Sequence, residues 1–78
     1  MRKKERKLVI AFHTTADAMA FESACKRESL PGRLIPVPRE ITAGCGMAWC
    51  ADEALRERLE AFAGEHGIEP DGMHVCMV

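Results

Sequence analysis

Aromatic side chains are scarce in this sequence, and tyrosine is absent. Three phenylalanines and one tryptophan are the whole aromatic content of 78 residues. Proteins that bind single-stranded nucleic acid stack its bases on aromatic side chains, so such a surface has little to be built from. We therefore do not expect nucleic acid as a partner.

Long apolar runs are missing as well. The apolar run near the N-terminus, residues 8–12, has five residues and ends before His13. A signal peptide needs an apolar core of about 7–15 residues, and a membrane helix needs roughly 18. We therefore expect no membrane segment and a cytoplasmic protein. In that compartment the four cysteines are expected as thiols rather than disulfides.

Common catalytic and cofactor motifs are also absent. The sequence has no G-x-S-x-G, no phosphate-binding P-loop and no G-x-G-x-x-G following a strand. Its closest cysteines, Cys45 and Cys50, have four residues between them, and no second close pair follows. Structural zinc sites combine two such pairs. We therefore expect no cofactor and no metal site.

The charge that is present is distributed unevenly along the chain. Residues 1–7 carry five basic side chains and one acid, which leaves six basic and eleven acidic residues elsewhere. A chain of 78 residues suffices for one domain and is too short for two. We predict a basic N-terminal arm at 1–7 and a single α+β domain at 8–78.

Hydrophobic patterning and turn residues predict six elements. In order, they are a strand at 8–12, a helix capped by Thr14 and stopped by Pro31-Gly32, strands at 33–37 and 47–51, a helix capped by Asp52 and ended by Gly64 or Gly67, and a strand at 73–78. Two β-α-β halves predict the ferredoxin-like split β-α-β fold, βαββαβ. We expect a four-stranded sheet with two helices on one face and the other face open.

This fold makes a prediction about a site. A right-handed crossover makes the first two strands parallel, with the third antiparallel between them. The end of the first strand, the start of the first helix and the connection at 38–46 then share one end of the sheet. We expect His13, Thr14, Arg39 and Cys45 to lie together there.

Cys45 differs from the other cysteines because glycines flank it in a turn. Gly44 and Gly46 permit positive φ and leave the sulfur approachable. Backbone N–H groups of the turn, the start of the first helix and Arg39 would supply positive potential, which lowers the pKa of a thiol from about 8.5. The residues alone leave two alternatives equal, a reactive thiol and a small residue tolerated in a turn.

The other cysteines fit packed positions. Cys25 falls on the apolar stripe of the first helix, and Cys50 and Cys76 lie within strands. A cysteine in such a position usually behaves as a small hydrophobic residue. We expect these three to be structural.

Several segments together resemble a known family. They are FHTT at 12–15, IPVPREIT at 35–42 and GCGMA at 44–48. This pattern is similar to that of the selenium/sulfur carrier protein-like family of small bacterial proteins, over nearly the whole chain after the arm. The P-x-P-R-E segment followed by Cys45-Gly46 is its most specific part. Thr42 stands at the place of the family's usual serine and keeps a hydroxyl.

The resemblance implies that Cys45 holds sulfur or selenium as a persulfide or selenopersulfide and passes it from a donor protein to an acceptor protein. Arg39 would hold the anion, Gly44 and Gly46 would give access, and Thr42 would hydrogen-bond the sulfur. Such a protein is a carrier more than an enzyme with turnover of its own.

Two alternatives stay open. The chain could be a non-catalytic module that binds a protein or ligand through the open sheet face, which could also form a homodimer. It could instead be a metal carrier that uses Cys45 and Cys50.

Overall fold

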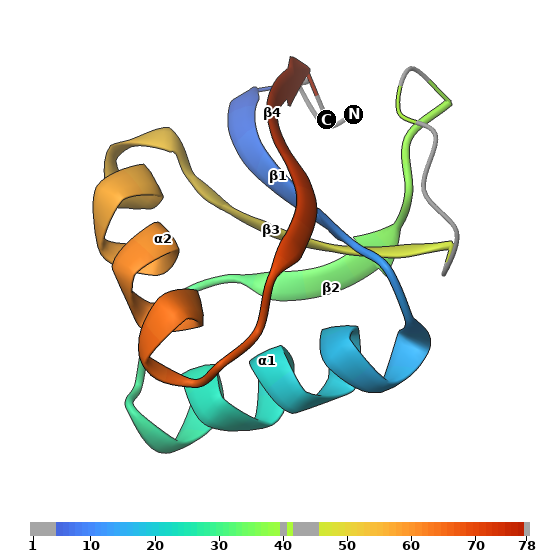
Figure 1. The fold of residues 1–78 in the computed structure, drawn as a ribbon. Helices are drawn as coiled ribbons and strands as arrows, with labels where there is room; N and C mark the ends of the chain where they lie inside the picture. Colours follow the sequence, from blue (N-terminus) through green and yellow to red (C-terminus); the bar gives the residue numbers. More distant parts are fainter. Residues whose placement is uncertain (1–4, 40, 42–45, 78) are drawn as a thin grey trace.

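The computed structural model describes residues 5–39, 41 and 46–77. Its elements are β1 (Arg6–Phe12), α1 (Thr15–Arg27), β2 (Arg33–Pro36), β3 (Met47–Asp52), the short 3₁₀ helix η1 (Glu53–Leu55), α2 (Arg56–Glu65) and β4 (Pro70–Met77). The described strands form one antiparallel sheet in the order β2-β3-β1-β4, and both helices lie on one side of it (Figure 1). This arrangement confirms the predicted α+β ferredoxin-like fold.

β1 is a central strand of the sheet, and its side chains point alternately to the two faces. It pairs with β3 on one side and β4 on the other. Because side chains alternate along a strand, Leu8 and Ile10 face the helices, whereas Val9 and Ala11 face the opposite way. The strand begins at Arg6, so two residues of the predicted basic arm belong to it.

Aromatic rings fill the core between the sheet and the helices. Phe21 of α1 is fully buried, and its ring lies 5.2 Å from that of Phe12, 5.8 Å from Trp49 and 5.9 Å from Phe62. Tilted and edge-to-face contacts at these distances add stability beyond the burial of apolar area. These four rings therefore connect β1, β3 and both helices.

α1 begins as predicted and ends at Arg27, before the predicted stop signal Pro31-Gly32. The Thr14 hydroxyl accepts a hydrogen bond from the backbone N–H of Asp17 at 3.1 Å, which confirms the N-cap. The helix ends at Arg27, and Ser29 takes the left-handed conformation with φ +57°. Gly32 has another role, because a Cβ there would lie 2.5 Å from Trp49 Nε1.

The second half of the chain also follows the prediction with shifted boundaries. Asp52 caps η1 rather than α2, accepting from the N–H of Ala54 at 3.0 Å. Gly67, at φ +66°, follows the end of α2, and β4 begins at Pro70 rather than residue 73. In the described part of the chain, no helix combines the length and hydropathy needed to cross a membrane.

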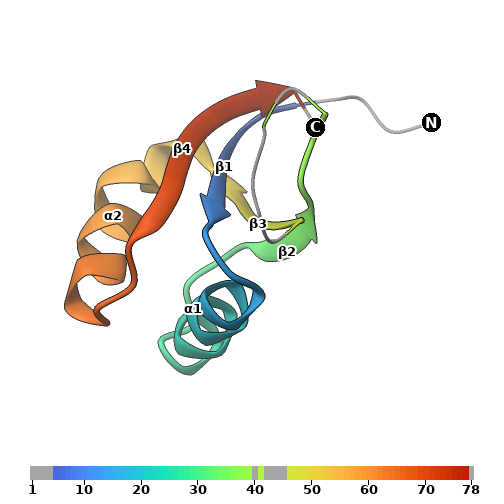
Figure 2. The ribbon, with the colours of Figure 1, turned by 45° about the vertical axis from the view of Figure 1, so that its right-hand side comes forward.

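The sheet face away from the helices, which we call the far face, is covered in part by the chain itself. Val9, Ala11 and Ala48 are buried there. Ile41, from the connection between β2 and β3, packs on them and is 7% exposed. Figures 1 and 2 show the start of this connection, residues 37–39, leaving β2 on the side away from the helices. The centre of this face is therefore not open, contrary to the expectation from sequence.

Candidate functional site

Two backbone hydrogen bonds organise the described part of the β2–β3 connection. The N–H of Val37 donates to the carbonyl oxygen of Gly46 at 3.0 Å, which adds one more pair to the β2–β3 ladder. The N–H of Ile41 donates to the carbonyl oxygen of Pro38, also at 3.0 Å, which closes a turn. Together with the buried Ile41 side chain, these bonds fix the connection at both ends and at one point within it.

Arg39 and Gly46 are the exposed residues in the described part of this connection. Arg39 lies in the Pro38–Ile41 turn and is exposed, with no hydrogen bond or ion pair to another described residue. Gly46 is exposed at φ +77°, and a Cβ added there would meet no atom within 4 Å. The positive φ expected at a flanking glycine is thus confirmed at Gly46. Cys45, Gly44 and Thr42 lie outside the described residues, so their roles remain predictions.

His13 and Thr14 lie at the same end of the sheet as Gly46. The β1–β3 pairing ends at Ala11↔Ala48, so His13 and Gly46 each lie two residues beyond the last pair. His13 Nδ1 is 3.4 Å from Asp71 Oδ1, and the Thr14 hydroxyl is used in capping α1. The structure brings the ends of these elements together as predicted.

These two residues are not bonded to the connection, however. No hydrogen bond or ion pair between described residues joins His13 or Thr14 to Arg39 or Gly46. α1 leaves on the helix side, whereas the start of the connection leaves on the far side (Figures 1 and 2). The expected contribution of the start of α1 to the site therefore has no contact among the described residues to support it.

The described cysteines occupy packed positions, as predicted. Cys25 is fully buried among the rings of the core, and this burial raises the pKa of its thiol to about 11. Cys50 in β3 is 7% exposed, and Cys76 in β4 is half-buried beside the far-face cluster. A buried thiol with a raised pKa is a poor nucleophile at neutral pH, so the position of Cys25 favours a structural role.

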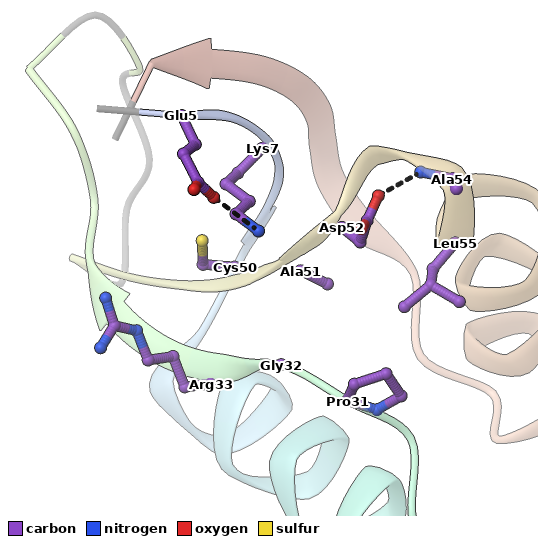
Figure 3. A pocket seen from close by; sticks show the side chains of 10 residues that line it. All are labelled: Glu5, Lys7, Pro31, Gly32, Arg33, Cys50, Ala51, Asp52, Ala54 and Leu55. Atoms are coloured by element: carbon purple, nitrogen blue, oxygen red, sulfur yellow. Dashed lines mark hydrogen bonds and ion pairs between the residues drawn. The ribbon is translucent and has the colours of Figure 1, made fainter. Parts of the chain in front are cut away.

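A pocket that the sequence did not predict lies at the opposite end of the sheet. The pocket has a volume of about 870 Å³, and Cys50 points into it (Figure 3). Its lining residues come from the starts of β1 and β2, the end of β3 and η1: Glu5, Lys7, Pro31, Gly32, Arg33, Cys50, Ala51, Asp52, Ala54 and Leu55. Strand pairing brings these residues together, and a pattern read along one strand contains no information on that pairing.

No group of three or more metal-binding side chains occurs among residues 5–39, 41 and 46–77. Cys45 lies outside that set, so the alternative of a metal carrier through Cys45 and Cys50 is not tested by this finding.

Comparison with protein families gives a match over most of the chain. A family model with the description "Putative Se/S carrier protein-like" matches residues 7–75, which is most of the chain. No curated protein and no solved structure matches the sequence.

Proposed function

This chain belongs to the Se/S carrier protein-like family, and on that premise we propose that it carries sulfur or selenium on Cys45. The matched region includes Cys45 and the whole β2–β3 connection. A carrier of this kind needs a donor protein and an acceptor protein, which we propose as its partners. The chalcogen travels as a persulfide or a selenopersulfide.

The transfer is a displacement at sulfur. The Cys45 thiolate attacks the terminal sulfur of a donor persulfide, R–S–SH, to form Cys45–S–SH and release R–S⁻. Attack on a donor selenopersulfide, R–S–SeH, forms Cys45–S–SeH and releases the same thiolate. No net oxidation occurs in either case, because a zero-valent atom moves from one thiolate to another. Attack by the acceptor's thiolate reverses the process.

The observation that carries the proposal is the exposure of Gly46, the residue that follows Cys45. Its positive φ and the open space around it leave room for a donor's active-site loop to approach. Cys25 and Cys50, by contrast, are at least nine-tenths buried. A protein-to-protein transfer requires contact between two macromolecules, and among these positions only the neighbourhood of Gly46 allows it.

Arg39 supports the same assignment through its charge. A persulfide is an anion near neutral pH, and a guanidinium forms strong, charge-assisted hydrogen bonds with anions. Arg39 is exposed and forms no ion pair with another described residue. The turn closed by Pro38 and Ile41 holds its backbone in place. We propose that Arg39 holds the terminal sulfur or selenium until transfer.

The test is persulfide loading followed by intact mass measurement. Incubation with a cysteine desulfurase and free cysteine should add one sulfur atom to the wild-type chain. Cys45→Ala should abolish the addition, whereas the matched variant Cys76→Ala should keep it. No addition to the wild type, or an addition that survives in Cys45→Ala, would reject the proposal.

Arg39→Gln separates anion binding from access. It should load at the wild-type endpoint and lose the added sulfur faster to a small thiol, because the terminal anion is no longer held. The variant Arg58→Gln, with the same charge change on α2, provides the control.

A further inference from the structure

We propose that the pocket at Cys50 is a second thiol site, which takes a small zwitterionic disulfide of the amino-acid type and forms a mixed disulfide with it. This inference goes beyond carriage on Cys45, because neither its residues nor its chemistry involve the β2–β3 connection. It concerns a small molecule rather than a partner protein.

The low exposure of the Cys50 sulfur favours reaction with a small molecule. Cys50 is 7% exposed, yet its side chain points from β3 into the pocket, toward the pair formed by Glu5 and Lys7 (Figure 3). A thiol with so little exposed surface is more accessible to a small molecule than to the loop of another protein. A volume of about 870 Å³ falls within the range of small-molecule sites, roughly 300–1,000 Å³.

Strand register places two cations beside this thiol. Arg33 of β2 is the direct partner of Cys50 across the sheet. Lys7 of β1 pairs with Asp52, which makes it a diagonal neighbour of Cys50 on the same face. Direct and diagonal neighbours lie within reach of long side chains. Both cations also line the pocket.

The four charged groups of the pocket suit a ligand that carries both signs. Lys7 Nζ is 3.2 Å from Glu5 Oε2, and Asp52 Oδ1 accepts from the N–H of Ala54. Arg33 is exposed and has no ion pair with another described residue. The guanidinium can therefore take a ligand carboxylate in bidentate geometry, while the carboxylates of Glu5 and Asp52 attract an ammonium group.

Apolar side chains complete the pocket. Pro31, Ala51 and Leu55 line it together with the backbone at Gly32. Ala51 and Leu55 belong to the helix-side cluster, whereas Cys50 pairs with Val9 on the far face, so these apolar side chains lie on the other side of β3 from the thiol. The charged groups on the side of the thiol are therefore the ones that would fix the orientation of the ligand.

The reaction is thiol–disulfide exchange. The Cys50 thiol loses its proton to solvent, and its sulfur attacks one sulfur of R–S–S–R to give Cys50–S–S–R and R–S⁻. The released thiolate takes up a proton. The Cys50 sulfur is oxidised, one half of the disulfide is reduced, and a further thiol reverses the step.

The test compares disulfides of different charge on the variant Cys45→Ala/Cys76→Ala, which retains Cys50 and Cys25. Cystine should modify Cys50 roughly tenfold faster than neutral bis(2-hydroxyethyl) disulfide, since one hydrogen bond to a charged group contributes about 1.5 kcal/mol or more. Dicationic cystamine and dianionic dithiodipropionate should fall below cystine. Because Cys45 is absent, a negative result bears on this proposal and leaves the carrier proposal untouched.

A charge variant shows whether the pocket recognises the ligand. Arg33→Gln should bring the cystine rate down to that of the neutral disulfide and leave the neutral rate unchanged. Arg58→Gln on α2 should change neither rate. A variant that only altered the thiol's intrinsic reactivity would change both rates together, and that result would overturn the proposal.

Three other results would also overturn it. They are no adduct on Cys50, equal rates with all four disulfides, or a faster reaction with the dianion or dication than with cystine. If the double variant does not fold, peptide mass mapping of the wild-type chain gives the same rates for Cys50 separately, with the inert Cys25 as an internal reference.

Discussion

The two faces of the sheet are built differently. The helix face is covered by two helices and filled with large side chains, with Phe21 at the centre of three ring contacts. Among the described residues, the far face carries a smaller cluster, in which Ile41 packs on Val9, Ala11 and Ala48, with the half-buried Ile35, Val37 and Cys76 beside it. One face is a hydrophobic core and the other is a thin layer under a connecting segment.

Because of this difference, we expect the helix face to provide most of the stability and the β2–β3 connection to carry the proposed chemistry. Burial of large apolar side chains dominates the stability of a small domain, so most of it should reside on the helix face. Arg39, on the N-terminal side of the proposed carrier thiol, belongs to the start of the connection, which leaves β2 on the far side (Figures 1 and 2). Substitutions on the two faces should therefore have different consequences.

Phe21→Ala should have the largest effect on stability. It removes a fully buried ring that contacts Phe12, Trp49 and Phe62, at an expected cost of about 3–5 kcal/mol. Urea denaturation followed by circular dichroism measures this cost, with Phe21→Leu as a control that retains most of the volume. A loss no larger than that of Ile41→Ala would contradict the division between the faces.

Ile41→Ala should have a smaller effect on stability and a larger one on function. The side chain is 7% exposed in a small cluster, so we expect about 2 kcal/mol, the lower end of the range for such truncations. Because Ile41 anchors the connection, persulfide loading of Cys45 should slow. Val37→Ala, which truncates a half-buried neighbour, is the matched control. Unchanged loading together with lost stability would show that the anchor is structural alone.

Cys25 should make the free energy of unfolding depend on pH in alkaline solution. Burial raises the pKa of its thiol from 9.0 to about 11. Between these values the unfolded chain releases the proton and the folded chain keeps it, so the free energy of unfolding falls as pH rises. At pH 10 the loss should be about 1.4 kcal/mol, the equivalent of one pKa unit. Cys25→Ala should lack this component, and equal pH slopes for both chains would contradict the assignment.

Local sequence patterns predicted the elements well where local chemistry decides them. Thr14 caps α1 as expected, and Asp52 caps the short helix η1 that precedes α2, because their oxygens accept from N–H groups two or three residues away. Gly67 follows the end of α2 with a positive φ, which is a local requirement. β2, which ends at Pro36, is an edge strand, the position in a sheet that tolerates proline.

Contacts distant in sequence account for what the sequence did not predict. The sequence predicts Pro31-Gly32 as a helix stop, whereas in the structure the side chain of Trp49 occupies the space where a Cβ of residue 32 would lie. Ile41 packs on Val9, more than thirty residues away, and the pocket at Cys50 depends on the register of three strands. Neither periodicity nor capping rules contain such information.

Thr14→Ala should have the smallest effect on stability. It also tests the prediction that the start of α1 contributes positive potential at Cys45, for which the described residues provide no contact. Loss of the cap to the N–H of Asp17 should cost about 1 kcal/mol, and Thr14→Ser should restore it. The alkylation rate of Cys45, measured as a function of pH, should be the same in Thr14→Ala as in the wild-type chain, because α1 and the start of the connection leave the sheet on opposite sides (Figures 1 and 2). An alkylation rate that falls in Thr14→Ala and recovers in Thr14→Ser would instead show that the start of α1 acts on the thiol. In that case a residue on the helix side would contribute both to stability and to the proposed chemistry of Cys45.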